Sequence, residues 1–217
     1  MALLLGVVGC SSLLPKPPLA PTVYTLDAPV TIDATSVRQP SARTVAKLAL
    51  VVHVPQSAAG YDSSRIVYSR DAQRLDAYAH SVWVDTPAQM LRPMMVAAIE
   101  STDAFAAVVA APSSARADIE LDTQILRLQH DFGTSPSRAR FTLRATLIDS
   151  VTRQVMASQE FDAVVDSASE DARGGVVAAH GAVRQVLTQL AALCREAPAR
   201  WKALHNDKQA ERGSVRP

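Results

Sequence analysis

Histidines and a glycine pair are the first residues to test for chemistry in this sequence, because their spacing decides which sites they can form. The five histidines, at positions 53, 80, 130, 180 and 205, lack the H-x-x-x-H, H-E-x-x-H or cysteine-paired spacing of a metal site. His130 and Asp131 could belong to a general-base arrangement, but no serine in a G-x-S-x-G context accompanies them. Gly174-Gly175 lacks the G-K-[ST] ending of a phosphate-binding loop. We therefore expect no enzyme, no metal site and no cofactor.

Cys10 is the residue to which the sequence assigns a modification. It follows a wholly apolar run, residues 1–9, and precedes two serines. Val7-Val8-Gly9-Cys10 resembles a bacterial lipobox, in which the cysteine thiol is acylated and becomes the first residue of the mature protein. A buried strand with a chance cysteine, a short core helix and a cloning remnant are the alternatives.

The residues after Cys10 favour lipidation over these alternatives. Four prolines between residues 15 and 21 make this stretch a stiff, extended tether rather than a packed element. No lysine or arginine precedes the apolar run, so we interpret residues 1–9 as the remnant of a truncated signal. Ser11, instead of aspartate, favours sorting to the outer membrane. Several acyl chains on one cysteine satisfy the requirement for stable anchoring.

The composition excludes several classes of protein. The 217 residues carry a net charge of +1, and only 5% of them are aromatic, which argues against a nucleic-acid-binding protein. Two cysteines cannot form a disulfide framework. No run reaches the roughly 18 apolar residues of a membrane-spanning helix.

The hydrophobic pattern predicts one α+β domain over residues 45–196, with a mostly antiparallel sheet and two helices packed on one face. One helix begins at Pro87, and the other follows a capping box from Ser167 to Glu170 and ends near Pro198. Residues 10–44 are the Pro-rich membrane tether, and residues 197–217 are expected to be a polar, disordered tail. The predicted strands are 48–54, 65–70, 74–78, 105–109, 118–128, 138–149 and 154–164, of which 105–109 is expected to be buried.

Six residues are candidates for partner contacts. Tyr24 and Leu26 form an island of β-formers inside the tether, which must pack on the domain's own sheet edge or on another subunit. Trp83 is either a core aromatic or an anchor for a partner. A basic stripe on one face of strand 138–149 is either a solvated, charge-protected strand or a docking face for an acidic partner or lipid head groups. The stripe consists of Arg138, Arg140 and Arg144.

The order of these features resembles the ABC-type transport auxiliary lipoproteins, the family that includes the lipoprotein component of paraquat-inducible operons. The resemblance runs from Cys10 to Arg195. Its features are the lipobox-like cysteine, Tyr24-Thr-Leu26, a strand ending at Val54-Pro55, Ile66-Val-Tyr68, Trp83 before Pro87-Ala-Gln-Met-Leu91, and a closing amphipathic helix.

The resemblance implies a function without catalysis. Members of this family are periplasmic partners of MCE (mammalian-cell-entry) proteins, anchored in the outer membrane, and the implied role is to dock the lipid conduit at that membrane. A ring of subunits would suit the end of a tubular partner, so we also expect a homo-oligomer. The alternatives are a structural or assembly lipoprotein of the envelope, a small periplasmic hydrolase, and a soluble lipid carrier.

Overall fold

The computed structural model describes residues 20–27, 48–71 and 73–214, with side chains described as far as residue 206. Cys10 and most of the predicted tether therefore lie outside the described residues. The elements are β1 Thr22–Tyr24, β2 Ala49–Val52, β3 Gln56–Ser57, β4 Arg65–Asp71, β5 Arg74–Trp83, α1 Pro87–Glu100, β6 Ala107–Ala110, β7 Ile119–Asp131, β8 Arg138–Asp149, β9 Val155–Asp166 and α2 Ala172–Ser214.

The sheet is organised around β7. One edge of β7 pairs in parallel with β2, β3 and β4 in succession, and the other edge pairs antiparallel with β8, which in turn pairs with β9. β6 extends the sheet beyond β2, while β5 and β1 extend it beyond β4. The longest pairings, β7–β8, β8–β9 and β4–β5, are antiparallel. This confirms a mostly antiparallel sheet, with short parallel additions.

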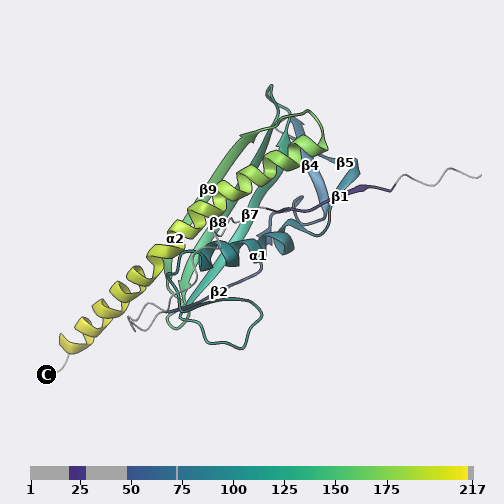
Figure 1. The fold of residues 1–217 in the computed structure, drawn as a ribbon. Coiled ribbons are helices and arrows are strands. Elements are labelled where there is room, and N and C mark those ends of the chain that lie inside the picture. The colour runs from purple at the N-terminus through teal and green to yellow at the C-terminus, as the bar shows by residue number, and fades with distance from the viewer. Residues whose placement is uncertain (1–19, 28–47, 72, 215–217) are drawn as a thin grey trace, which may run out of the picture.

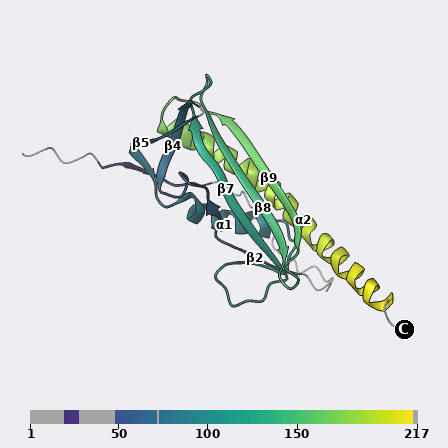
Figure 2. The same cartoon turned by 180° about the vertical axis from the view of Figure 1, so that it is seen from behind.

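Both helices lie on the same face of the sheet (Figure 1), and the view from behind shows the strands uncovered (Figure 2). α2 packs over β7, β8 and β9, and α1 lies beside it against β2, β3 and β6. The predicted α+β domain with two helices on one face is confirmed. Among the described residues, no helix has the length and apolarity to cross a membrane.

The alternation in β8 explains why the helices settle on this face. Every second residue of β8 is apolar and fully buried against the helices, so the opposite face carries the polar side chains. The predicted bulge in β7 is present between Ile125 and Arg127, where the register with β8 shifts. The buried β8 residues are Ala139, Phe141, Leu143, Ala145 and Leu147.

Two predictions for the closing helix are wrong. The cap is Asp171, whose Oδ1 accepts the N–H of Gly174 at 2.8 Å, whereas the Oε1 of Glu170 accepts the N–H of Ser137. The helix also continues through Pro198 to Ser214, although a disordered tail was expected from residue 197. Proline removes one backbone donor, and the surrounding alanine, lysine, arginine and glutamate are strong helix formers.

The strand expected at 105–109 is also different. It forms as β6, Ala107–Ala110, at the edge of the sheet, with its end residues exposed and its central residues half-buried. A short apolar run cannot by itself distinguish a central strand from an edge strand, because the neighbours decide burial. The first helix begins at Pro87 as predicted and continues through Pro93.

Candidate functional site

The described part of the N-terminal segment is held by its own domain. β1 pairs in parallel with β5, and the N–H of Val84 donates to the carbonyl of Tyr24 at 2.7 Å. Leu26 is buried in the core, and its N–H donates to the Sδ of Met90 on α1 at 3.4 Å. The Nε2 of His180 on α2 lies 2.9 Å from the carbonyl oxygen of Thr25. The segment therefore packs on its own sheet edge and between two helices.

This arrangement accounts for three of the six predicted contact residues. Tyr24 lies beside Trp83 in the parallel register and packs against the core, as Leu26 and Trp83 do. Trp83 is only 4% exposed, which fits its interpretation as a core aromatic. Partner contacts through these three side chains remain a prediction, while the contacts that the structure gives them are within the chain. The histidine and methionine that hold the segment carry no local sequence signal.

The basic stripe is neutralised by acids on the neighbouring strand. The Arg140 Nε lies 2.9 Å from the Asp162 Oδ1, and the other two arginines have equivalent acidic partners on β9. We call this set the β8–β9 charge ladder. It consists of the pairs Arg138–Asp166 at 3.1 Å, Arg140–Asp162 at 2.9 Å and Arg144–Glu160 at 3.0 Å.

Hydrogen bonding has a larger effect than burial on the pKa of Asp162, the central acid of this ladder. Partial burial alone would raise the pKa of Asp162, but hydrogen bonds from Arg140 and Thr142 hold that pKa below its usual value. The hydrogen bond to Asp162 likewise raises the pKa of Arg140. The face therefore has paired charges rather than a net positive field, and this weakens the expectation of an acidic partner there.

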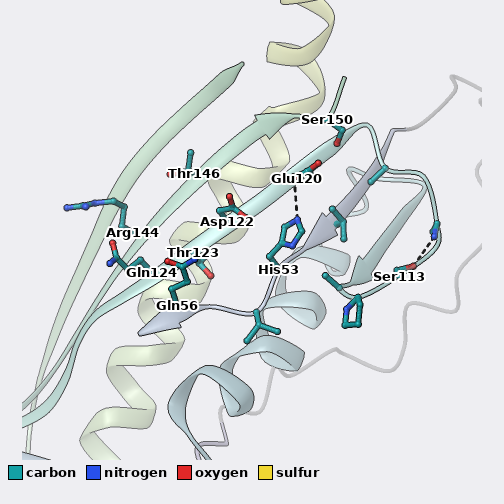
Figure 3. Close-up of a pocket in the computed structure, with 16 residues that line it drawn as sticks. His53, Gln56, Ser113, Glu120, Asp122, Thr123, Gln124, Arg144, Thr146 and Ser150 are labelled. Atoms are coloured by element: carbon teal, nitrogen blue, oxygen red, sulfur yellow. Dashed lines mark hydrogen bonds and ion pairs between the residues drawn. The ribbon is translucent and has the colours of Figure 1, made fainter. Parts of the chain in front are cut away.

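A hollow of about 840 Å³ lies on the uncovered face, between β2, β7 and the segment 111–117 (Figure 3). Glu120 points into it, and its carboxylate lies 3.4 Å from the Nε2 of His53 and 2.6 Å from Arg153. Burial alone would raise the pKa of Glu120. The hydrogen bond and the charge of Arg153 lower this pKa by more than burial raises it, so the net shift is downward. The described residues contain no group of three histidines, cysteines or acids that could hold a metal ion.

Outside this hollow, the side chains of a serine and a histidine lie within hydrogen-bond distance of each other. The Nε2 of His130 lies 2.7 Å from the Oγ of Ser137, and its Nδ1 lies 2.8 Å from the hydroxyl of Tyr78. His130 is 2% exposed and Ser137 is fully buried, and none of the three residues lines the hollow. Burial lowers the pKa of His130 and raises that of Tyr78.

Tight packing closes this cluster. Gly175 in α2 lies directly against the imidazole, because a Cβ at that position would stand 2.4 Å from the Nδ1 of His130. The arrangement resembles part of a catalytic triad, but no substrate could reach the hydroxyl of Ser137. We interpret it as a structural connection between the β7–β8 hairpin, β5 and the first turn of α2.

The opposite end of the sheet holds a second buried group. Asp149 is fully buried, its Oδ1 accepts the N–H groups of Val151 and Thr152, and its Oδ2 lies 3.5 Å from the Nε2 of His205. The ring of His205 stacks on Trp201 with the centroids 3.7 Å apart. These contacts tie the turns of α2 beyond Pro198 to the β8–β9 turn.

Comparison with known proteins shows a match to one protein family. The sequence model of the ABC-type transport auxiliary lipoprotein component matches residues 24–191. The crystal structure of a Xanthomonas campestris protein assigned to DUF330 has 27% sequence identity and a TM-score of 0.67, covering 88% of this chain and 99% of that one. An uncharacterised protein has 13% identity and a TM-score of 0.61, covering 82% and 99%, which shows the fold alone. No curated protein matches the sequence.

Proposed function

The chain belongs to the family of ABC-type transport auxiliary lipoprotein components, and on that premise we propose that it is a non-catalytic periplasmic lipoprotein of the outer membrane. Acylated Cys10 is the anchor, and an MCE-domain protein of a lipid transporter is the partner. Lipid passes from the conduit to the membrane without being altered by this chain.

The observation that carries the proposal is the attachment of residues 22–27 to the domain. Because β1 is fixed to β5 and Leu26 is fixed between the helices, the tether enters the domain at one defined place. β1 and β5 lie at the end of the molecule away from the C-terminal turns of α2 (Figure 1). We infer that the β4–β5 end faces the membrane and that the far end, with the β8–β9 turn and α2 beyond Pro198, faces the conduit.

The chemistry of the described residues supports a role without catalysis. Within the described residues, the one hydrogen bond between a serine and a histidine side chain is buried. The hollow on the uncovered face presents carboxylates, amides and hydroxyls, together with His53 and Arg144. Its Glu120 carboxylate is already bound to Arg153. Such groups can bind a polar partner, but they do not form an activated nucleophile with an adjacent general base.

Mass spectrometry of the mature protein tests the anchor. The full-length chain, with a complete lipoprotein signal upstream, is expressed in a Gram-negative host. We expect an acylated Cys10 in the wild type and no acylation in Cys10→Ala. The matched control is Cys194→Ala, which should keep the acyl group because Cys194 is buried in α2. An unmodified wild-type protein that retains its N-terminal residues would contradict the anchor.

Affinity capture tests the partner. The acylated chain, co-expressed with the MCE-domain protein of its transport system, should retain that protein from a detergent extract. Acylation without capture would instead favour the alternative of a structural or assembly lipoprotein. Sedimentation of the purified chain will show whether it forms the expected homo-oligomer.

A further inference from the structure

Three valines and an arginine share the outward side of the sheet beside the point where the chain enters it. Val23 in β1 and Val84, directly after β5, are each 57% exposed. The register places Val23 opposite Val82, and Val82 opposite Arg65 of β4. Side chains paired in register point to the same face of a sheet. We call these four residues the β1–β5 patch.

The patch faces away from the core. Trp83 is buried, so alternation along β5 directs Val82 to the opposite side. Val84 lies in the bend directly after β5 and is 57% exposed. The hydrogen bond between the Val84 N–H and the Tyr24 carbonyl keeps β1 beside this part of the chain. Single exposed valines are ordinary, whereas neighbouring ones on adjacent strands indicate a contact surface.

The charge of the patch differs from that of the β8–β9 charge ladder. Arg65 is exposed, and within the described part of the chain no carboxylate forms an ion pair with it. The adjacent acid is Asp85, whose carboxylate accepts the N–H of Thr86 at 2.6 Å. Exposed aliphatic side chains next to an unneutralised cation are the composition of a surface that rests on anionic lipid.

The length of the tether limits where the patch can lie. Val23 is thirteen residues after Cys10, so even a fully extended chain places it within roughly 45 Å of the anchored residue. Exposed valines are also present at Val151 and Val155, but these lie at the β8–β9 turn, at the opposite end of the sheet.

We propose that the β1–β5 patch contacts the lipid surface to which the chain is anchored, with the valines among the acyl–headgroup boundary and Arg65 at the phosphates. This inference rests on the proposed function for the proximity of the membrane. A lipid surface fits better than a second copy, because a symmetric contact would bring two Arg65 side chains together. The surface area that two exposed valines can bury is also far smaller than the roughly 800 Å² that each partner buries in a stable protein interface.

Vesicle binding of the unacylated full chain tests the proposal. The probe is the Cys10→Ala chain with vesicles of phosphatidylethanolamine containing about one quarter phosphatidylglycerol. We expect the combined Val23→Ser and Val84→Ser variant to bind about tenfold more weakly. The matched control, Val151→Ser with Val155→Ser, should bind as the parent does. Arg65→Gln should lose about fivefold, and only on vesicles that contain phosphatidylglycerol.

A fluorescent label locates the contact independently of these affinities. The Cys10→Ala background leaves Cys194 as the remaining thiol, and its burial, which also raises its pKa to about 12, keeps it unlabelled. An environment-sensitive label at Val84→Cys should shift to the blue on vesicles, and the same label at Val151→Cys should not.

Two results would overturn the proposal. One is equal vesicle binding by the parent and the Val23/Val84 variant, with no spectral shift at position 84. The other is a change of oligomeric state in that variant without a change in vesicle binding, which would assign the patch to a second copy. Neither measurement needs acylation or a partner, so an unmodified Cys10 or a failed capture would refute the proposed function separately.

Discussion

Each end of the sheet holds a histidine, but the two histidines are held differently. At the β4–β5 end, both ring nitrogens of His130 meet hydroxyl groups, and Gly175 packs against the ring. At the far end, His205 meets the carboxylate of Asp149 and stacks on Trp201. The first cluster is closed by packing and neutral hydrogen bonds, whereas the second depends on an ionisable pair of which the histidine side chain is 29% exposed.

This difference indicates which end of the sheet can change its conformation more easily. Contacts between neutral, largely buried groups resist changes of pH and salt. A single carboxylate–imidazole contact near a helix end can open at a smaller cost in free energy. We interpret the β4–β5 end as the fixed base of the domain and the C-terminal turns of α2 as its adjustable end, where we propose that the partner docks.

Among the variants that test this comparison, Gly175→Ala should cause the largest loss of stability. The added Cβ would overlap the imidazole of His130, and overpacking of this kind should lower the free energy of unfolding by about 3 kcal/mol. Urea denaturation measures the loss. The control is Gly181→Ala, where the Cβ would lie 3.3 Å from Val165 and the change should stay below about 1 kcal/mol. Equal effects at the two glycines would show that the cluster is not tightly closed.

Leu26→Ala should cost nearly as much, because it removes a buried side chain from the contact between the N-terminal segment and the helices. The expected loss is about 2–3 kcal/mol of unfolding free energy. Val23→Ala, three residues earlier on the exposed side, should change the same quantity by less than about 0.5 kcal/mol. If the two variants have the same midpoint in urea, the segment is not attached as described.

Acid should loosen the far end through Asp149. Burial opposes ionisation, but hydrogen bonds from Thr152 and Val151 and the charge of His205 keep the pKa of the Asp149 carboxyl below its ordinary value. A depressed pKa contributes stability that is present above about pH 4 and is lost as the pH falls through the folded value. Protection against hydrogen exchange in residues 198–206, after correction for the pH dependence of intrinsic exchange, should therefore fall in acid.

Asp149→Asn is the matched variant for this prediction. It should speed exchange in residues 198–206 at neutral pH, at a cost of about 1–2 kcal/mol, and it should remove most of the acid dependence there. Exchange in residues 176–186, near the His130 cluster, should not change. Acceleration along the whole of α2 would mean that the two ends are not independent.

Arg140→Gln should have the smallest effect. It breaks one pair of the β8–β9 charge ladder on the solvent side of the sheet, and exposed ion pairs contribute less than about 1 kcal/mol. Thermal unfolding at low and high salt measures the difference, which should shrink as salt is added. A loss as large as that of Leu26→Ala would show that charge on the uncovered face, rather than burial, holds the sheet together.

The sequence predicted the parts of the fold that depend on local periodicity. Strand β8 alternates cleanly, and the phase shift in β7 marks its bulge. Pairings between distant segments had no such signal. The acids that neutralise the basic stripe lie on β9, and Asp149 meets a histidine that follows the proline expected to end the helix. The exposure of Val23 and Val84 likewise depends on the alignment of β1 with β5.

Photo-crosslinking in the outer-membrane fraction tests the central claim most directly. A crosslinking residue replaces Val151 at the far end or Val84 at the β4–β5 end, both of which are exposed, in the chain co-expressed with its MCE-domain protein. The account predicts crosslinks to the MCE-domain protein from position 151 and to lipid from position 84. Crosslinks to the MCE-domain protein from position 84, with none from position 151, would contradict it.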